Sequence, residues 1–242
     1  MRISLIPNDL DILYPDTLID INHQQEWQMN LYEERIKQFK KNPIGNNKIV
    51  FLGNSITEGG GDWNKRFSVN NIVNRGISGD ITEGILVRLD EITFYKPKAL
   101  FLLIGINDIF NADIPNREMI TPQYVSNNII KIVNKILDSS PLTEIFVQTI
   151  LPINHEIYIE NNGSFPEHNV PLDEQIIQIN AIIINQADIH QYKVIDLHSL
   201  FKNKDGFLNK LYTTDGVHLN NKGYDRWVNF INSYIQDLQR KN

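Results

Sequence analysis

One serine in this chain stands where chemistry is plausible, directly after a short apolar run. Ser55 lies in the segment GNSITEGGGDW, which follows KIVFL, a pattern that predicts a buried strand. A serine at the end of a strand can cap the next turn, belong to a phosphate-binding loop or act as a nucleophile. The residues around it and in the rest of the chain decide among these three interpretations.

The glycines that follow Ser55 do not match a phosphate-binding loop. A Walker loop requires a lysine after its last glycine, but Asp62 and Trp63 follow here. Three consecutive glycines, at 59–61, also lack the G-x-G-x-x-G spacing of a dinucleotide site. Glu58 and Asp62 would repel a phosphate group. These residues argue against a nucleotide cofactor, and a flavin-binding protein has no supporting signature.

A nucleophilic serine needs a base, a residue that orients the base, and hydrogen-bond donors for an oxyanion. In TTDGVHLNNKGY, Asp215 and His218 are three residues apart, so the carboxylate can reach the imidazole Nδ1 and leave Nε2 for Ser55. NRGISGD offers the backbone N–H of Gly79, and IGIND offers the side-chain amide of Asn107. These five residues are the candidate active site.

Strand-like runs and helical patterns alternate along the chain and could position these residues. The strand-like runs cover 48–53, 71–76, 99–105, 144–150 and 193–197, and the helical patterns cover about 31–41, 81–95, 122–139, 172–190 and 221–238. This alternation predicts an α/β fold with a mostly parallel five-stranded sheet covered on both faces. Its active crevice is expected at the carboxyl ends of the strands. Thr121 and Asn220 are the expected N-caps of two helices, with Pro122 at the first helical position.

We find no internal repeat, low-complexity tract or linker, so we expect a single domain. It would cover residues 46–242, preceded by an N-terminal extension, 1–45, whose helix, in the stretch QQEWQMNLYEERIKQFKKN, packs against the domain's edge. Residues 151–171 contain Pro, Gly and Asn and form a long connection, which is typical of a lid or a binding loop.

Composition excludes several classes of function. The 242 residues carry a net charge of −6 and no basic stripe, which disfavours nucleic-acid partners. The absence of cysteine rules out disulfides, thiolate metal sites and cysteine nucleophiles. The apolar runs fall short of the ~18 residues of a membrane span. The N-terminus lacks a signal-peptide pattern, so the cytoplasm is the default expectation, with the compartment otherwise open.

Four segments, in this order, resemble the SGNH/GDSL family of esterases and lipases. GNSIT is similar to the family's first block, with Asn54 where aspartate is more familiar. NRGISGDIT resembles the second block, GIND the third and DGVH the last. The run from NRGISGD to GIND is particularly similar to the branch of platelet-activating-factor acetylhydrolase catalytic subunits and bacterial carbohydrate acetylesterases. The resemblance spans roughly residues 46–235.

The resemblance implies a flavodoxin-like, three-layer α/β/α sandwich and assigns a role to each residue. Ser55 is the nucleophile, His218 the general base and then acid, and Asp215 the residue that orients His218. The backbone N–H groups of Ser55 and Gly79 and the amide of Asn107 hold the oxyanion. The implied activity is a serine esterase that needs no metal or cofactor and removes a short acyl group, preferably acetyl, from an alcohol such as a carbohydrate.

Other interpretations stay open at this point. A lysophospholipase or thioesterase would share the fold, and a catalytically silent binding module would keep it without activity. Asp108 is expected to be structural, whereas Trp63 could line a substrate pocket or the core. His155 and His168, in the long connection, could contact substrate or solvent. A homodimer is possible because the acetylhydrolase subunits that the chain resembles can pair.

Overall fold

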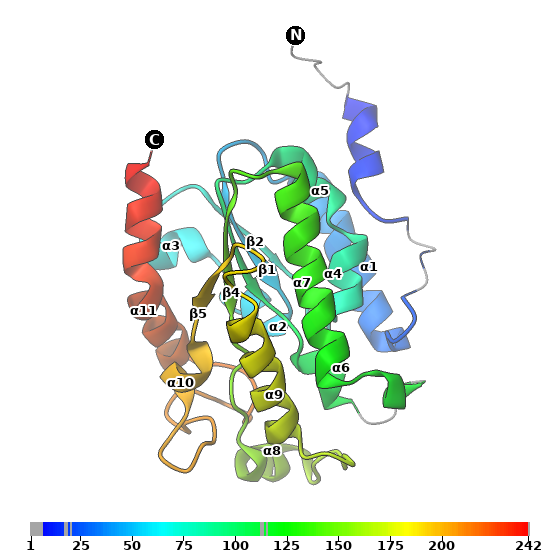
Figure 1. Ribbon diagram of the computed structural model, residues 1–242, viewed down its shortest axis with the longest axis vertical. Coiled ribbons are helices and arrows are strands. Elements are labelled where there is room, and N and C mark those ends of the chain that lie inside the picture. The colour runs from blue at the N-terminus through cyan, green and yellow to red at the C-terminus, as the bar shows by residue number, and fades with distance from the viewer. Residues whose placement is uncertain (1–6, 17–18, 20, 112–113, 115, 242) are drawn as a thin grey trace.

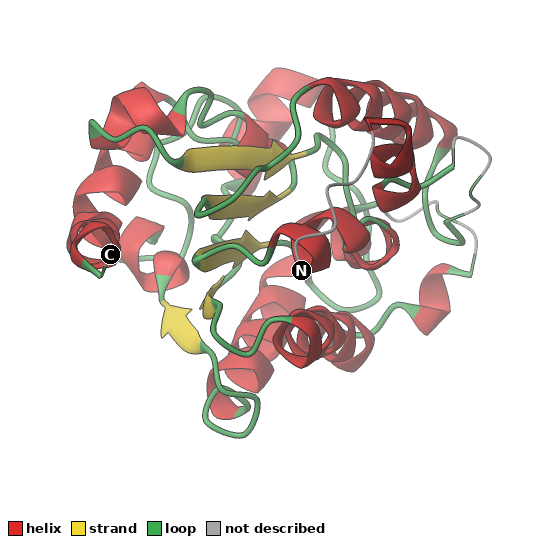
Figure 2. Ribbon diagram, turned by 90° about the horizontal axis from the view of Figure 1, so that it is seen from above, coloured by secondary structure: helices red, strands yellow, loops and turns green. Residues whose placement is uncertain are grey.

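The computed structural model describes residues 7–16, 19, 21–111, 114 and 116–241. Its centre is a five-stranded sheet in the order β2-β1-β3-β4-β5, and all the strand pairs are parallel. The strands are β1 (Ile49–Gly53), β2 (Ile72–Gly76), β3 (Ala99–Leu103), β4 (Glu144–Gln148) and β5 (Lys193–Ile195). Helices cover both faces (Figures 1 and 2), which confirms the predicted three-layer, flavodoxin-like sandwich. The strand order reverses at β1, so a crevice is expected where β1 ends.

Alternate residues of each strand enter opposite layers, as the two-residue period of a strand requires. In β1, Val50 and Leu52 face one core, whereas Ile49 and Phe51 face the other. The first core lies under α4 (Thr82–Val87), α5 (Asp90–Tyr95), α7 (Pro122–Ser139) and α9 (Leu172–Asn185). The second lies under α3 (Trp63–Phe67), α10 (Leu197–Phe201) and α11 (Asn221–Arg240).

The second core is rich in aromatic rings. Phe51 stacks on Trp63 and Phe101, with ring centroids 4.5 and 4.9 Å apart. Trp63 also meets Trp227 of α11 edge to face, and both are buried. Trp63 therefore belongs to the core, and the alternative in which it lines a substrate pocket is wrong.

Two stretches differ from the predicted pattern of helices. The single helix expected at 81–95 is two helices, which are separated at Arg88. The side chain of Arg88 points inward and forms a buried ion pair with Asp80. The connection at 151–171 contains α8 (His155–Asn162), which Asn154 caps and Gly163 ends at φ 82°. None of the α8 residues is fully buried. A helix without a buried face needs no apolar stripe, so the sequence carries no helical periodicity here.

The remaining elements are shorter or lie at the N-terminal end. They are the 3₁₀ helices η1 (Pro7–Leu13) and η2 (Arg117–Met119), and the helices α1 (Glu26–Lys41), α2 (Ser55–Glu58) and α6 (Ile106–Phe110). Thr121 and Asn220 cap α7 and α11 through their side chains, as predicted. In the part of the chain that is described, no helix has the length and apolarity to cross a membrane.

The N-terminal segment adds a third, smaller core beside β2. Tyr32, Ile36 and Phe39 of α1 pack with Ile77 and Ile81, which follow β2. The helix begins at Glu26 and ends at Lys41, within the stretch QQEWQMNLYEERIKQFKKN in which the sequence predicts it. Its first turns thus reach the region just past the carboxyl end of β2, where the candidate residue Gly79 lies.

Candidate active site

Ser55 is the first residue of α2, two residues beyond the end of β1. The Oδ1 atom of Asn54 accepts a hydrogen bond of 3.1 Å from the N–H of Ile56 and caps this short helix. Aspartate would offer the same oxygen, which explains why asparagine can replace it in the first block. Glycine is required at position 53, just before Asn54, because a Cβ there would lie 2.2 Å from the Leu103 carbonyl oxygen.

Three of the predicted residues meet in one hydrogen-bonded chain. The Oγ of Ser55 lies 2.9 Å from Nε2 of His218. The Nδ1 of the same ring lies 2.7 Å from Oδ2 of Asp215. Serine and histidine are 163 positions apart in the sequence, so the fold alone brings them together. The arrangement matches the serine–histidine–aspartate order that the motifs predict.

Asp215 is fixed by its own loop. Its Oδ1 accepts hydrogen bonds from the backbone N–H groups of Val217 and His218, at 2.9 and 2.7 Å. Partial burial acts to raise the pKa of Asp215, but the hydrogen bonds from His218 and Val217 outweigh it and lower the pKa to about 2. The carboxylate is therefore charged at neutral pH and can hold a histidine proton at Nδ1.

The helix in the long connection lies directly against this loop. Asn154 donates its backbone N–H to the carbonyl of Gly216 at 2.8 Å. Gly216 has φ 89°, and a Cβ there would lie 2.3 Å from the Asn154 oxygen and 2.9 Å from the Tyr158 nitrogen. The side-chain amide of Asn154 also bonds the carbonyl of Leu208. The start of α8 thus supports the loop that carries Asp215 and His218.

The donors expected for an oxyanion lie at the ends of β1, β2 and β3. No described residue accepts a hydrogen bond from the backbone N–H of Ser55 or of Gly79. Gly79 has φ 78°, a left-handed conformation that glycine adopts without strain. The side chain of Asn107 donates one amide hydrogen to the carbonyl of Asp80 at 2.9 Å, which leaves its second hydrogen available.

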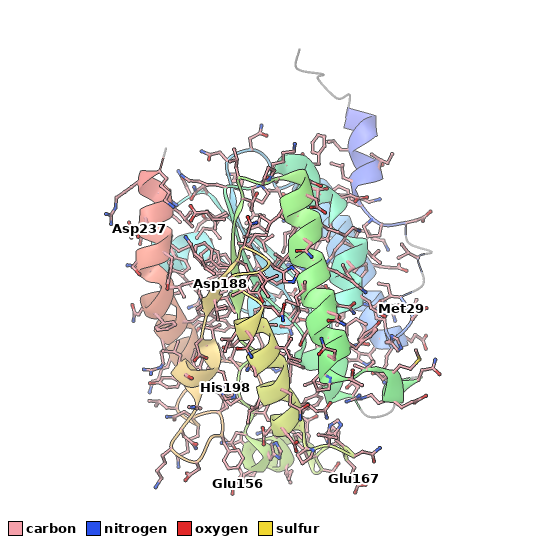
Figure 3. The ribbon with its side chains drawn as sticks, in the orientation of Figure 1. Met29, Glu156, Glu167, Asp188, His198 and Asp237 are labelled. Atoms are coloured by element: carbon pink, nitrogen blue, oxygen red, sulfur yellow. The ribbon has the colours of Figure 1, made fainter. Side chains whose placement is uncertain are left out.

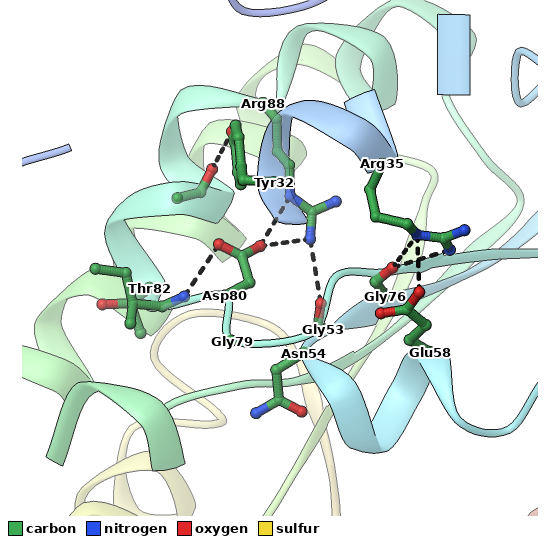
Figure 4. A network of polar contacts seen from close by, with 12 residues as sticks. Tyr32, Arg35, Gly53, Asn54, Glu58, Gly76, Gly79, Asp80, Thr82 and Arg88 are labelled. Atoms are coloured by element: carbon green, nitrogen blue, oxygen red, sulfur yellow. Dashed lines mark hydrogen bonds and ion pairs between the residues drawn. The ribbon is translucent and has the colours of Figure 1, made fainter. Parts of the chain in front are cut away.

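A buried ion pair anchors the turn that contains Gly79 (Figure 4). Both Nε and Nη2 of Arg88 bond Oδ2 of Asp80, at 3.0 and 2.8 Å. Arg88 also donates to the carbonyl of Gly53, at 3.2 Å, and so ties this turn to the strand that precedes Ser55. We missed this pair in the sequence. An arginine at the end of an apolar helix, eight residues after an aspartate, was the available signal.

Helix α1 supports the same turn from outside. Gln28, which is buried, donates its amide to the carbonyl of Gly79 at 2.8 Å. Arg35 pairs with Glu58 at 3.1 Å, and Glu58 accepts hydrogen bonds from the backbone and the hydroxyl of Ser78. No local motif marks these residues, because their partners lie 20 to 51 positions away in the chain.

The other residues singled out in the sequence lie beside the site. Asp108 is buried and accepts hydrogen bonds from the N–H and hydroxyl of Thr82, which supports its structural interpretation. Burial raises the pKa of Asp108 to about 7. The ring of His155 stacks on Phe165, with centroids 4.2 Å apart, and His168 packs edge-on against the same ring. Among the described residues, no group of His, Cys, Asp or Glu has the arrangement of a metal site.

The sequence matches a family of known proteins. Residues 51–226 match the model of the GDSL-like lipase/acylhydrolase family. The chain is 25% identical over 231 residues to human platelet-activating factor acetylhydrolase IB subunit alpha1, covering 93% of this chain and 89% of the relative. It is also 25% identical over 196 residues to the rat alpha2 subunit, covering 78% and 76% of the two chains.

Solved structures share the fold. A GDSL-like lipase from Bacteroides thetaiotaomicron superposes with a TM-score of 0.68 at 22% identity, covering 85% of this chain and 97% of that one. The acetylxylan esterase Axe2 from Geobacillus stearothermophilus gives a TM-score of 0.60 at 18% identity, covering 81% and 95%. At these identities the likeness concerns the arrangement of strands and helices.

Proposed function

The chain belongs to the GDSL-like lipase/acylhydrolase family and is an ester hydrolase, and on that premise we propose that it removes short acyl groups, acetyl above all, from carbohydrate esters. The reaction proceeds through an acyl-enzyme on Ser55. The observation that carries this proposal is the continuous contact from Ser55 Oγ through the His218 ring to Asp215.

The proposed reaction has two halves. In the first, His218 Nε2 takes the proton of Ser55 as Oγ attacks the ester carbonyl, and the resulting oxyanion accepts hydrogen bonds from the Ser55 and Gly79 N–H groups and the Asn107 amide. His218 then returns the proton to the leaving alcohol, and the acyl group stays on Ser55. In the second half, His218 deprotonates a water molecule that attacks the acyl-enzyme, which releases the acid and restores the serine.

The electrostatics of the site fit this sequence of steps. Asp215, charged at neutral pH, stabilises the imidazolium that forms each time His218 accepts a proton. The oxyanion donors are backbone and amide groups held before the reaction begins, and loss of one such donor typically costs on the order of 10²–10³ in kcat.

The preference for acetyl and for a carbohydrate has separate support. The relatives and structural neighbours include proteins named as a platelet-activating factor acetylhydrolase and an acetylxylan esterase, both named for acetyl esters. The side chain of His218 is 45% exposed, so the leaving alcohol is not confined to a closed cavity. An open site of this kind accommodates a large alcohol with a small acyl group.

The first experiment is mass spectrometry after treatment with a fluorophosphonate, together with hydrolysis of p-nitrophenyl acetate. We expect a single adduct on Ser55 in the wild-type protein, and no adduct and no hydrolysis in Ser55→Ala. A wild-type protein that neither reacts nor hydrolyses the ester would instead be a binding module that has kept the fold.

A second experiment tests the substrate. We expect release of acetate from acetylated xylo-oligosaccharides, and a rate that falls as the acyl chain of p-nitrophenyl esters lengthens from two to eight carbons. Faster hydrolysis of the eight-carbon ester, or of a lysophospholipid, would overturn the substrate assignment and leave the acyl-enzyme mechanism intact. Hydrolysis of an acyl thioester in preference to both would assign a thioesterase.

A further inference from the structure

Trp27 differs from the other two tryptophans of the chain. Trp63 and Trp227 are buried in the second core, at 1% and 0% exposure, whereas Trp27 is 49% exposed in the first turn of α1. A half-exposed indole gains less from burial than a core residue does. The exposed part of the ring is a surface on which a ligand can pack.

The exposed ring lies against a residue of the candidate oxyanion hole. A Cβ on Gly79 would lie 2.7 and 2.9 Å from Cζ3 and Cη2 of Trp27, so the six-membered ring packs directly on the Gly79 backbone. The neighbouring residue, Gln28, bonds the Gly79 carbonyl at 2.8 Å. One turn of α1 thus holds Gly79 in place and sets an aromatic surface beside it.

The orientation of the ring is also fixed. The Nε1–H of Trp27 donates to the side-chain oxygen of Gln25 at 2.7 Å. The polar atom of the indole therefore has a hydrogen-bond partner, and part of the ring lies against Gly79. About half of the residue's surface stays open to a ligand. A ring oriented in this way loses little conformational entropy when a ligand packs on it.

We propose that Trp27 is a substrate-binding subsite, on which a sugar ring of the carbohydrate ester packs through its apolar face. This inference rests on the proposed function, because the subsite has a role only beside a reacting acyl group. The carbonyl oxygen of the ester lies at the Gly79 N–H during the reaction, so the sugar attached through the ester oxygen to the same carbonyl carbon is within reach of the indole.

A sugar ring fits this surface better than an acyl chain. An acyl chain gains most from an enclosed apolar channel, whereas Trp27 offers one exposed surface at the rim of the site. A sugar has a flat apolar face for the indole and hydroxyl groups that stay in water. Tryptophan suits this position because it combines a large rigid surface with a small entropic cost of ordering.

Trp27 lies outside the segment that the family model matches. The family match covers residues 51–226, and Trp27 lies before it, in α1. In Figure 3, Met29 of the same helix lies on the flank of the molecule, and Glu156 and Glu167 lie at the lower end, where the carboxyl ends of the strands point. The subsite therefore lies on the side of the candidate active site that faces α1, whereas α8 borders the loop of Asp215 and His218.

Steady-state kinetics on two substrates test the inference. Trp27→Ala should lower kcat/KM for an acetylated xylo-oligosaccharide by roughly tenfold, mostly through KM. The loss for p-nitrophenyl acetate should be several-fold smaller, and Trp27→Phe should recover most of the oligosaccharide activity. Phe94→Ala is the matched control. Phe94 is also exposed, at 41%, but it lies in the last turn of α5, near the amino edge of the sheet, so its removal should change neither substrate's kinetics.

Three kinetic outcomes would overturn the subsite. Equal losses on both substrates would mean that Trp27 acts by positioning Gly79. A loss confined to p-nitrophenyl octanoate would mean that the indole binds acyl chains. An unchanged oligosaccharide rate in Trp27→Ala, with hydrolysis of both substrates intact, would remove Trp27 from the site and leave the proposed function standing.

A binding measurement separates the subsite from the chemistry. Ser55→Ala binds without turnover, so its tryptophan fluorescence can be titrated with the acetylated xylo-oligosaccharide. We expect a saturable change in the Ser55→Ala protein that disappears in Ser55→Ala/Trp27→Phe, because the two remaining tryptophans are buried. A change that persists in the double variant, or no change in either protein, would overturn the inference.

Discussion

The two sides of Ser55 are built in different ways. On the base side, the side chains of His218 and Asp215 are 45% and 34% exposed, and the hydrogen bonds that fix Asp215 lie within one short loop. On the oxyanion side, Asp80 and Arg88 are 0% and 4% exposed and connect the ends of two strands. One side is a local turn, and the other is part of the core.

The carboxyl groups of the two sides show the same contrast. Asp215, partly buried but rich in hydrogen bonds, has its pKa lowered to about 2, whereas burial raises the pKa of Asp108 to about 7. We infer that the proton-transfer residues can be substituted without unfolding the protein. Substitution of the residues that support the oxyanion side should also lower the free energy of unfolding. Four substitutions test this difference.

Removal of His218 should have the largest effect, and only on activity. His218→Ala should lower kcat/KM for p-nitrophenyl acetate by about 10⁴-fold or more, because the serine loses its general base. The melting temperature should stay close to that of the wild type, since the ring is half exposed. His190→Ala, on the surface of the molecule and bonded to Asn134, is the control and should keep full activity.

Asp215→Asn should lower activity less than His218→Ala does. The amide can still contact Nδ1, but it lacks the charge that stabilises the imidazolium, so we expect a loss on the order of 10²–10³-fold, below the ~10⁴ seen in serine proteases. Kinetics of both variants, measured side by side with p-nitrophenyl acetate, provide the comparison. A greater loss in Asp215→Asn than in His218→Ala would reverse our ranking of the two residues.

Arg88→Met should affect stability on the oxyanion side. It leaves Asp80 buried without its partner, and such a change typically costs about 3–5 kcal/mol in the free energy of unfolding. Urea denaturation should show this loss, with a fall in kcat in the remaining folded protein. The control is Arg240→Met, which breaks an exposed pair with Asp237 and should cost less than about 1 kcal/mol. A stable Arg88→Met protein would contradict the contrast between the two sides.

The base side was largely predictable from the sequence, for a physical reason. Asp215 and His218 are three residues apart, and the loop that joins them makes its own hydrogen bonds, so a short motif contains most of the geometry. The strands were also predictable, because buried parallel strands are apolar along their whole length. The predicted runs overlap all five strands, with one or two extra residues at one end.

The oxyanion side was predictable only in part. Gly79 and Asn107 carry visible motifs, but their supports do not. Gln28 reaches Gly79 across 51 positions, and the stretch that looks like one helix in the sequence is two helices separated at Arg88. Helix α8 was missed because it has no buried face of its own and is defined by caps at Asn154 and Gly163. Contacts of this kind depend on the fold and leave no local periodicity.

The smallest predicted effect concerns Asp108 and the pH dependence of stability. In the unfolded chain its carboxyl ionises with a pKa near 3.9, whereas in the folded protein burial keeps the proton bound up to about pH 7. Between these values the folded state binds more protons than the unfolded state. The free energy of unfolding should therefore fall as pH rises through this window, by at most about 1.4 kcal/mol per pH unit from this group.

Asp108→Asn should remove that contribution, since the amide does not ionise and its oxygen can still accept from Thr82. We expect urea denaturation between pH 4.5 and 7 to show a variant whose stability relative to the wild type rises with pH. Asp215→Asn is the matched control, because folding lowers the pKa of Asp215 and raises that of Asp108. Its lost carboxylate has a depressed pKa, so its effect on stability should be constant through this window and shrink only below about pH 4. Parallel curves for Asp108→Asn and the wild type would show that Asp108 is ionised in the folded protein, and the oxyanion side would then hold a buried charge beside Asn107.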